Sequence, residues 1–217
     1  MKKILIGFYV LIIIGIIICI GNSDIFDSKK SEAIAAGEKI YKSNCIFCHG
    51  ETGKGEGSKT GTALNSQNFL SNVSDKDLYN YVKYGREGTV MPAYGPRMSD
   101  KDLKNVVAFI RDWQNEEKEF DVPKKLSGDS ERGKAQYNLY CLNCHGEAGA
   151  GKDKMGTALS SPQYLKYNTD KQIWIDAAYG REDTRMGPSL KGLEGARQLK
   201  EKDITDIISY IRSLEKK

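Results

Sequence analysis

The chain has 217 residues, a formal net charge of +4, five cysteines, five methionines and only two histidines. It shows no nucleic-acid or nucleotide chemistry. The glycine-rich stretch after residue 50 looks like a phosphate-binding loop, but Gly55 follows Lys54 where such a loop needs serine or threonine.

An apolar segment opens the chain. Lys2 and Lys3 precede an uncharged run over residues 4–21, which at 18 residues is close to the lower limit for spanning a bilayer. A cleaved signal peptide would have a shorter apolar stretch and a small-residue cleavage site. We therefore predict an uncleaved transmembrane anchor over residues 1–21. The two lysines place the N-terminus in the cytoplasm and everything after the anchor outside.

Cys19 lies within this predicted anchor. It is either a thiol buried in the membrane or a lipid-bearing cysteine, although Ile18 stands where lipoprotein signals usually have a small residue. Residues 22–30 then form a tether whose fully extended reach is about 30 Å. The remainder of the chain is therefore expected to stay near the membrane surface.

Two halves of the remaining chain match each other. Cys45-Ile-Phe-Cys-His49 recurs as Cys141-Leu-Asn-Cys-His145, at an offset of 96 residues. His-Gly-Glu, Gly-Thr-Ala-Leu and Tyr-Gly-Arg-Glu segments recur as well, at an offset of 95 or 96. A period this long indicates a duplicated domain. We predict a first domain over residues 31–115, a charged linker over 116–130 and a second domain over 131–217.

The repeated five-residue motif is typical of covalent haem c attachment, in which two thiols bond one porphyrin and the following histidine ligates the iron. A zinc half-site and a redox dithiol are the alternatives for a single motif. Neither alternative explains why both histidines of the chain complete a motif.

On these residues the chain resembles membrane-anchored class I c-type cytochromes with two haems, over about residues 31–217. The resemblance extends to cytochrome c4-like carriers and to the two-haem subunits of bc-type complexes and cbb3-type oxidases. It implies an all-α fold, in which an anchor helix is followed by two cytochrome c domains. It also implies two covalently bound haem c groups, held by Cys45, Cys48, Cys141 and Cys144.

The same resemblance implies that a methionine supplies the sixth iron ligand. With His49 and His145 as the proximal ligands, Met91 and Met186 are the predicted distal ligands, because they lie 42 and 41 residues beyond their own histidines. Met91 precedes a proline, as is usual in the family. Met186 is followed by Gly187 and then Pro188, so its loop is expected to be looser. We expect Met98 and Met155 to serve in packing.

Two repeated arginines, Arg86 and Arg181, follow a Tyr-Gly pair in each half. A guanidinium matches a carboxylate in two-point geometry, so these side chains are candidates for binding haem propionates. Ordinary surface salt bridges are the alternative.

Helix starts are marked by capping boxes at Ser74-x-x-Asp77, Ser99-x-x-Asp102 and Thr169-x-x-Gln172. The last helix of each domain has apolar residues at helical spacing. The family suggests that Gly37 and Gly133 let the first and last helices cross closely, with Phe109 or Trp113 and Tyr210 as partners. An insertion around residues 190–197 is expected to be a surface loop near the second haem.

The predicted function is single-electron relay. The partners would be a quinol-oxidising bc-type complex as donor and an oxidase, reductase or photosynthetic reaction centre as acceptor, or small soluble redox carriers. The protein would be a tethered carrier or a complex subunit, and not an enzyme. The alternative is a dihaem redox enzyme of the peroxidase or thiosulfate dehydrogenase type, which would need an open or labile second haem. Residues 122–217 carry 17 basic and 13 acidic side chains. Either the second domain faces an acidic partner, or the excess is a lysine-rich solvated surface.

Overall fold

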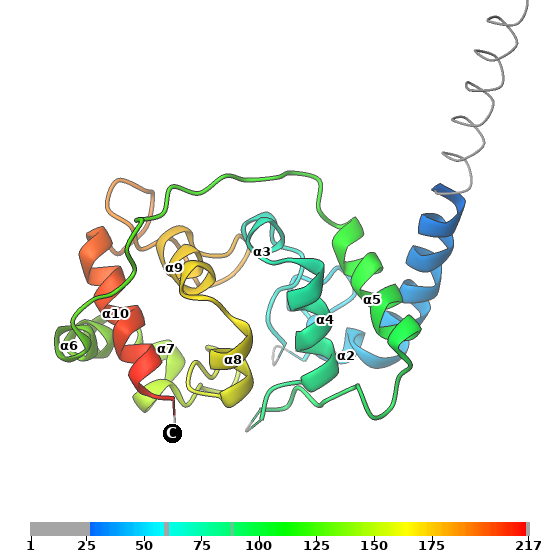
Figure 1. Cartoon of the computed structure of the whole chain (residues 1–217), viewed down its shortest axis with the longest axis horizontal. Coiled ribbons are helices and arrows are strands. Elements are labelled where there is room, and N and C mark those ends of the chain that lie inside the picture. The colour runs from blue at the N-terminus through cyan, green and yellow to red at the C-terminus, as the bar shows by residue number, and fades with distance from the viewer. Residues whose placement is uncertain (1–26, 59–60, 88, 216–217) are drawn as a thin grey trace, which may run out of the picture.

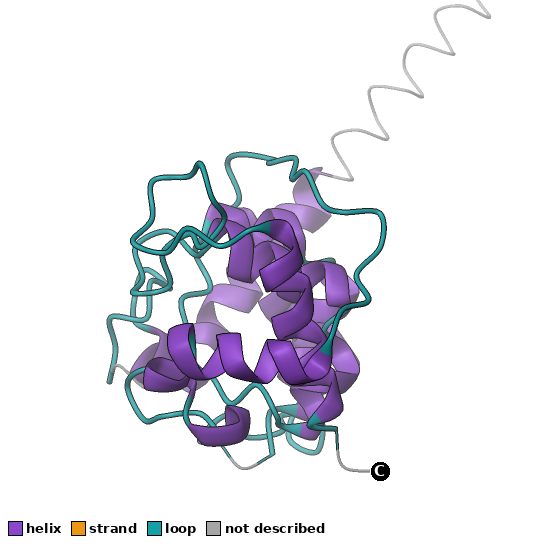
Figure 2. Cartoon of the chain, turned by 90° about the vertical axis from the view of Figure 1, so that its left-hand side faces the viewer, coloured by secondary structure: helices purple, strands orange, loops and turns teal. Residues whose placement is uncertain are grey.

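The computed structural model describes residues 27–58, 61–87 and 89–215. Regular structure in these residues is helical, apart from two isolated β-bridges (Figures 1 and 2). The all-α prediction is therefore confirmed. No helix among the described residues is long and apolar enough to cross a bilayer. The predicted anchor over residues 1–21 lies outside the described part of the chain.

The helices of the two halves follow the same order. Residues 27–44 are helical, and the labelled helices after them in the first half are α2 (Ile46–His49), α3 (Gln67–Asn72), α4 (Asp75–Tyr84) and α5 (Asp100–Asp112). The second half contains α6 (Ser130–Tyr140), α7 (Leu142–His145), the 3-10 helix η1 (Glu147–Gly149), α8 (Pro162–Tyr167), α9 (Asp170–Tyr179) and α10 (Glu201–Ser213).

All three predicted capping boxes are present. They begin α4, α5 and α9, and in each the side chains of the cap residue and of the third helical residue bond each other's backbone N–H. Two otherwise unpaired amide groups at each helix start are satisfied in this way. The helix positions therefore follow from local sequence.

The first and last helices of each half cross through a glycine. A Cβ at Gly37 would overlap the carbonyl oxygen of Asn105 and lie 2.9 Å from the Cβ of Phe109, as predicted. The second half has the equivalent crossing. Gly133 meets the backbone of Asp206, and Tyr210 lies four residues further along α10, as Phe109 does after Asn105. The rings of Tyr210 and Tyr137 pack there with centroids 5.3 Å apart.

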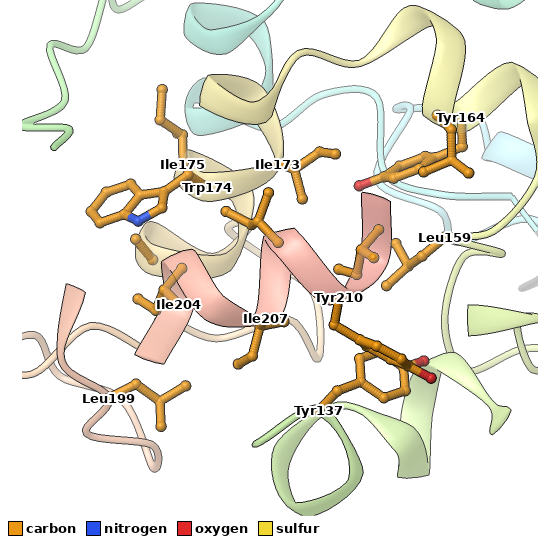
Figure 3. Close-up of a cluster of buried hydrophobic side chains, with 14 residues drawn as sticks. Tyr137, Leu159, Tyr164, Ile173, Trp174, Ile175, Leu199, Ile204, Ile207 and Tyr210 are labelled. Carbon is orange, nitrogen blue, oxygen red and sulfur yellow. The ribbon is translucent and has the colours of Figure 1, made fainter. Parts of the chain in front are cut away.

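Each half has its own apolar core. The periodic apolar residues of α5 and α10 are buried, as their spacing predicts. In the second core, Trp174 of α9 is fully buried and lies in one cluster with Ile204 and Ile207 of α10 (Figure 3). Burying such a side chain stabilises a fold by about 1.5–3 kcal/mol. These cores hold the helices that bear the repeated motifs.

The two halves pack against each other through equivalent residues. Asp77 and Gln172 occupy the same position in the two copies, and the Gln172 amide donates to the Asp77 carboxylate at 2.9 Å. The rings of Tyr84 and Tyr167, which do not occupy equivalent positions, also stack between the halves, at 5.1 Å. The contact between Asp77 and Gln172, at equivalent positions, indicates an approximate two-fold relation between the halves.

The segment between α5 and α6 runs over the top of both halves (Figure 1). Residues 114–129 contain no helix. Phe120 nevertheless packs on the ring of Tyr179 at 4.9 Å, and the Gly128 amide donates to the Ser209 hydroxyl at 2.7 Å. The start of the predicted linker is bonded to the first half, where the Lys118 amide donates to the Ser71 hydroxyl at 2.9 Å, and its later part is attached to the second half.

Candidate haem-binding sites

Each motif histidine is held by a backbone carbonyl from its own half. The Nδ1 atom of His49 lies 2.8 Å from the Thr62 oxygen, and that of His145 lies 3.0 Å from the Thr157 oxygen. A carbonyl only accepts hydrogen bonds, so Nδ1 is the protonated nitrogen and Nε2 has a free lone pair. Burial lowers the pKa of both imidazoles and favours the neutral ring. Both histidines are therefore prepared as metal ligands through Nε2.

The four motif cysteines are free and half-buried. Burial raises the pKa of the Cys45 and Cys141 thiols to about 11. A redox dithiol needs the opposite shift, because the thiolate is the reactive form. In the described part of the chain, no three or more His, Cys, Asp or Glu side chains cluster as a metal site would require. The dithiol and zinc alternatives therefore find no support.

The predicted distal methionines close the same turn in both halves. The amide of Arg86 donates to the carbonyl of Met91 at 3.0 Å, and the amide of Arg181 donates to the carbonyl of Met186 at 2.7 Å. A threonine hydroxyl, from Thr89 or Thr184, accepts from each methionine amide. The two loops thus share one backbone design.

The surroundings of the methionines differ. Met91 and Met98 are among the side chains packed against the first core, whereas those packed against the second core do not include Met186. The sulfur of Met155 accepts a hydrogen bond from Arg185 at 3.1 Å. The residues after each distal methionine also differ. The Tyr94 hydroxyl, three residues beyond Met91, donates to the Asn44 carbonyl, directly before the first motif, at 2.8 Å.

In the second half, Ser189 stands where the first has Tyr94. The carbonyl directly before the second motif, that of Tyr140, instead accepts from Arg197 at 3.2 Å. Arg197 belongs to the predicted insertion, which therefore lies beside the second motif, as expected. In the second half, therefore, the residue that bonds the carbonyl before the motif lies 11 residues beyond Met186.

The repeated arginines lie between the halves and not in surface salt bridges. The Arg181 guanidinium pairs with Asp176 at 3.0 Å, and both side chains are largely buried. It also lies over the ring of Phe69, at 4.3 Å from the centroid. Burial alone would lower the pKa of Arg181, but Asp176 outweighs burial and raises it.

Arg86 is arranged differently. Its guanidinium lies over the rings of Tyr164 and Tyr81, at 5.3 and 5.8 Å from their centroids. No carboxylate among the described residues pairs with it. Burial, and secondarily the charge of Arg181, lower its pKa.

A partly buried cation without a carboxylate partner favours the binding of an anion. The Arg86 guanidinium therefore fits a propionate of haem c. Together with the free Nε2 atoms and the unbridged thiols, it gives a set of groups suited to that cofactor.

Sequence reasoning missed the histidine-orienting carbonyls of Thr62 and Thr157. Both belong to the repeated Gly-Thr-Ala-Leu segments, so the duplication itself was a usable signal. The contacts of the two arginines across the halves had no comparable signal.

Known proteins support this arrangement. Residues 32–110 match the family described as cytochrome C oxidase, cbb3-type, subunit III, and residues 130–215 match cytochrome c. Cytochrome c6 of Picosynechococcus sp. is 37% identical over 84 residues, which cover 36% of this chain and 71% of that protein. An all-α fold with two such matches in tandem defines a protein with two cytochrome c domains.

Longer relatives are cbb3-type cytochrome c oxidase subunits named CcoP. That of Rubrivivax gelatinosus is 26% identical over 68% of this chain, and that of Azospirillum brasilense is 25% identical over 84%. The chain covers 42% and 62% of these two proteins. A chain of the reducing HAO-like protein complex of Kuenenia stuttgartiensis has a similar fold, with a TM-score of 0.51 and 20% identity. The match covers 83% of this chain and 96% of the chain from that complex.

The chain belongs to the c-type cytochromes. The predicted resemblance to class I c-type cytochromes of the dihaem, tandem-domain group is confirmed, and haem c is the cofactor that this family binds.

Proposed function

We propose that this protein is a dihaem electron-transfer cytochrome. One haem c would be attached to Cys45 and Cys48, with His49 and Met91 as iron ligands. The other would be attached to Cys141 and Cys144, with His145 and Met186. When bound, each haem supplies a one-electron couple between ferrous and ferric iron, with no bond made or broken in a substrate. The domains would comprise residues 31–115 and 131–217.

The observation that supports this most is that the same hydrogen bonds surround the predicted iron ligands in both halves. In each half a threonine carbonyl orients the histidine, and an arginine amide closes the methionine loop. Such fixed hydrogen bonds hold the ligands in place and limit rearrangement when the charge of the site changes. This is what a relay requires.

We place the protein in the cytoplasmic membrane with its haem domains on the outer side, because residues 4–21 are apolar and two lysines precede them. Tethering would raise the effective concentration of partners in the same membrane. The names of the relatives support an oxidase complex as the acceptor or host assembly. A bc-type complex is the proposed donor, and the protein would serve as a tethered carrier or as a subunit.

The second domain is the proposed docking side for an acidic redox partner. Leu139, Tyr140 and Leu142 are exposed at its motif, and Arg197 and Lys152 bond backbone carbonyls beside them. Complementary charge speeds encounter and is screened by salt. Electron-transfer rates measured from low to high ionic strength should fall. Electron-transfer rates that do not change with ionic strength would contradict the proposed docking side.

The test of the whole proposal is a redox titration of the purified holoprotein, with the haem content measured as the pyridine haemochrome and carbon monoxide added to the reduced form. We expect two covalently bound haems, two reversible one-electron steps and no carbon monoxide binding. Variants M91A and M186A should each open one haem to carbon monoxide.

The second candidate function is a dihaem redox enzyme, and the glycine after Met186 is what favours it. Carbon monoxide binding by the second haem of the wild-type protein would support this alternative and contradict the relay. Peroxidase and thiosulfate oxidation assays would then identify the reaction class.

A further inference from the structure

The loop of Met186 is held by the other domain. Glu182 lies four residues before Met186, and its carboxylate accepts from the Ser66 hydroxyl at 2.5 Å and from the Asn68 amide at 3.0 Å. Lys118 of the linker donates to it at 2.6 Å. Ser66 and Asn68 are buried residues at the start of α3 in the first domain. Charge-assisted bonds of this kind are the strong ones.

A second contact lies at the start of the same loop. The Asn68 side-chain amide donates to the carbonyls of both Tyr179 and Gly180, at 3.2 Å each. Asn68 therefore bonds the end of α9 with its side chain and Glu182 with its backbone. The segment from Tyr179 to Glu182 is fixed at both ends by one residue of the first domain.

The corresponding carboxylate in the first domain has no such clamp. Glu87 is exposed, and its carboxylate has one long bond, of 3.4 Å, from the Gln163 side chain. No cation among the described residues pairs with it. The methionine that it precedes, Met91, is restricted instead by Pro92, whose ring fixes one backbone dihedral.

The second loop needs outside support for a structural reason. Gly187 follows Met186, and a Cβ there would find nothing within 4 Å, so this residue has neither the fixed φ of the Pro92 ring nor a packed side chain. Ser189 also replaces the tyrosine that ties the first loop to its own motif. The first loop is bonded across the domains by one neutral side chain, that of Gln163, which accepts from the Glu87 amide at 2.7 Å. The loop with the weaker internal restraint is the one whose carboxylate is held from outside by several bonds, one of them from a cation.

We propose that the first domain and the linker position the iron ligand Met186 of the second domain. Ser66 and Asn68 of the first domain and Lys118 of the linker do so by holding Glu182. This inference rests on the proposed role of Met186 as the distal ligand. Domain contact then determines how often the second iron site opens. Those hydrogen bonds also hold the pKa of Glu182 below its ordinary value against the effect of burial, as expected for a clamped anion.

Imidazole binding to the ferric holoprotein is the experiment, because imidazole must displace the methionine. Its apparent affinity therefore reports the fraction of molecules with an open loop. A hydrogen bond to a charged group contributes about 1.5–3 kcal/mol, so E182A should raise the affinity of the second haem at least about tenfold. E182Q should have a smaller effect, because an amide oxygen still accepts one bond. The methionine-to-iron charge-transfer band should weaken in parallel.

E87A is the matched control and should change neither haem by more than about threefold. K118M is the second variant. It alters a partly buried linker residue that lies outside both domains, and it should also open the second haem. M91A and M186A identify which haem responds.

Two outcomes are separable. A wild-type protein whose second haem lacks the methionine band contradicts the proposed function. If the wild-type protein has both bands but E182A and K118M leave the imidazole affinity of the second haem unchanged, the proposed positioning of Met186 is overturned and the proposed function still stands.

Discussion

Gly133 of α6 lies directly against the backbone of α10, and we predict that G133A destabilises the second domain. A Cβ at this position would overlap the Asp206 carbonyl oxygen and lie 3.0 Å from the Ile207 nitrogen. Non-bonded heavy atoms prefer about 3.5–4.0 Å. Both contacted atoms belong to backbone, so only a movement of one whole helix relieves the overlap.

Two opposing effects set the magnitude. Adding a methyl group to a well-packed contact costs about 1–3 kcal/mol, and a rigid backbone contact places G133A at the upper end. Alanine is better than glycine in a helix by about 1 kcal/mol. The net loss in the free energy of unfolding is therefore about 2 kcal/mol.

Urea unfolding of the holoprotein, followed by far-ultraviolet circular dichroism, measures this loss. N138A, at an exposed position of the same helix, should stay within about 0.5 kcal/mol of the wild-type protein. G37A should behave like G133A, because a Cβ there would overlap Asn105. A gain of about 1 kcal/mol in G133A would show that helix propensity decides, and would refute the close crossing.

Three further predictions use the same unfolding assay. S99A removes the cap of α5 and should cost about 1 kcal/mol, and no change would contradict the capping role. Burial favours the neutral form of Asp206, but bonds from Arg132 and a backbone amide outweigh it and lower its pKa. The ionised carboxylate therefore stabilises the fold above about pH 4, and this stability is lost as the pH falls. D206N should flatten that acid dependence, and an unchanged acid limb would contradict it. Y94F removes the bond to Asn44 and should cost about 1 kcal/mol, with increased imidazole affinity at the first haem only.

Local sequence predicted the elements of the fold well, because helix starts depend on residues three apart. The capping boxes at Ser74, Ser99 and Thr169 form as expected, and the apolar stripes of the last helices are buried. The glycine crossing was predicted from family resemblance and holds for Gly37. Gly133 meets α10 at the equivalent place, at Asp206, which is four residues before Tyr210.

The haem ligands and domain boundaries remain predictions, and the structure adds a physical context to them. The sequence alone could not decide whether Arg86 and Arg181 bind haem propionates or form surface salt bridges. The structure places both between the domains, one paired with Asp176 and one without a carboxylate.

The sequence by itself determined the duplication, the two attachment motifs, the spacing to each methionine and the positions of most helices. These features are short-range patterns, or copies of one pattern, and need no knowledge of distant contacts. Only the tertiary structure decided how the halves meet, because Ser66 and Glu182 are 116 residues apart and nothing local relates them. The loop of Met186 is the clearest case. Its glycine was visible in the sequence, but the clamp from the other domain arises from packing of two whole domains.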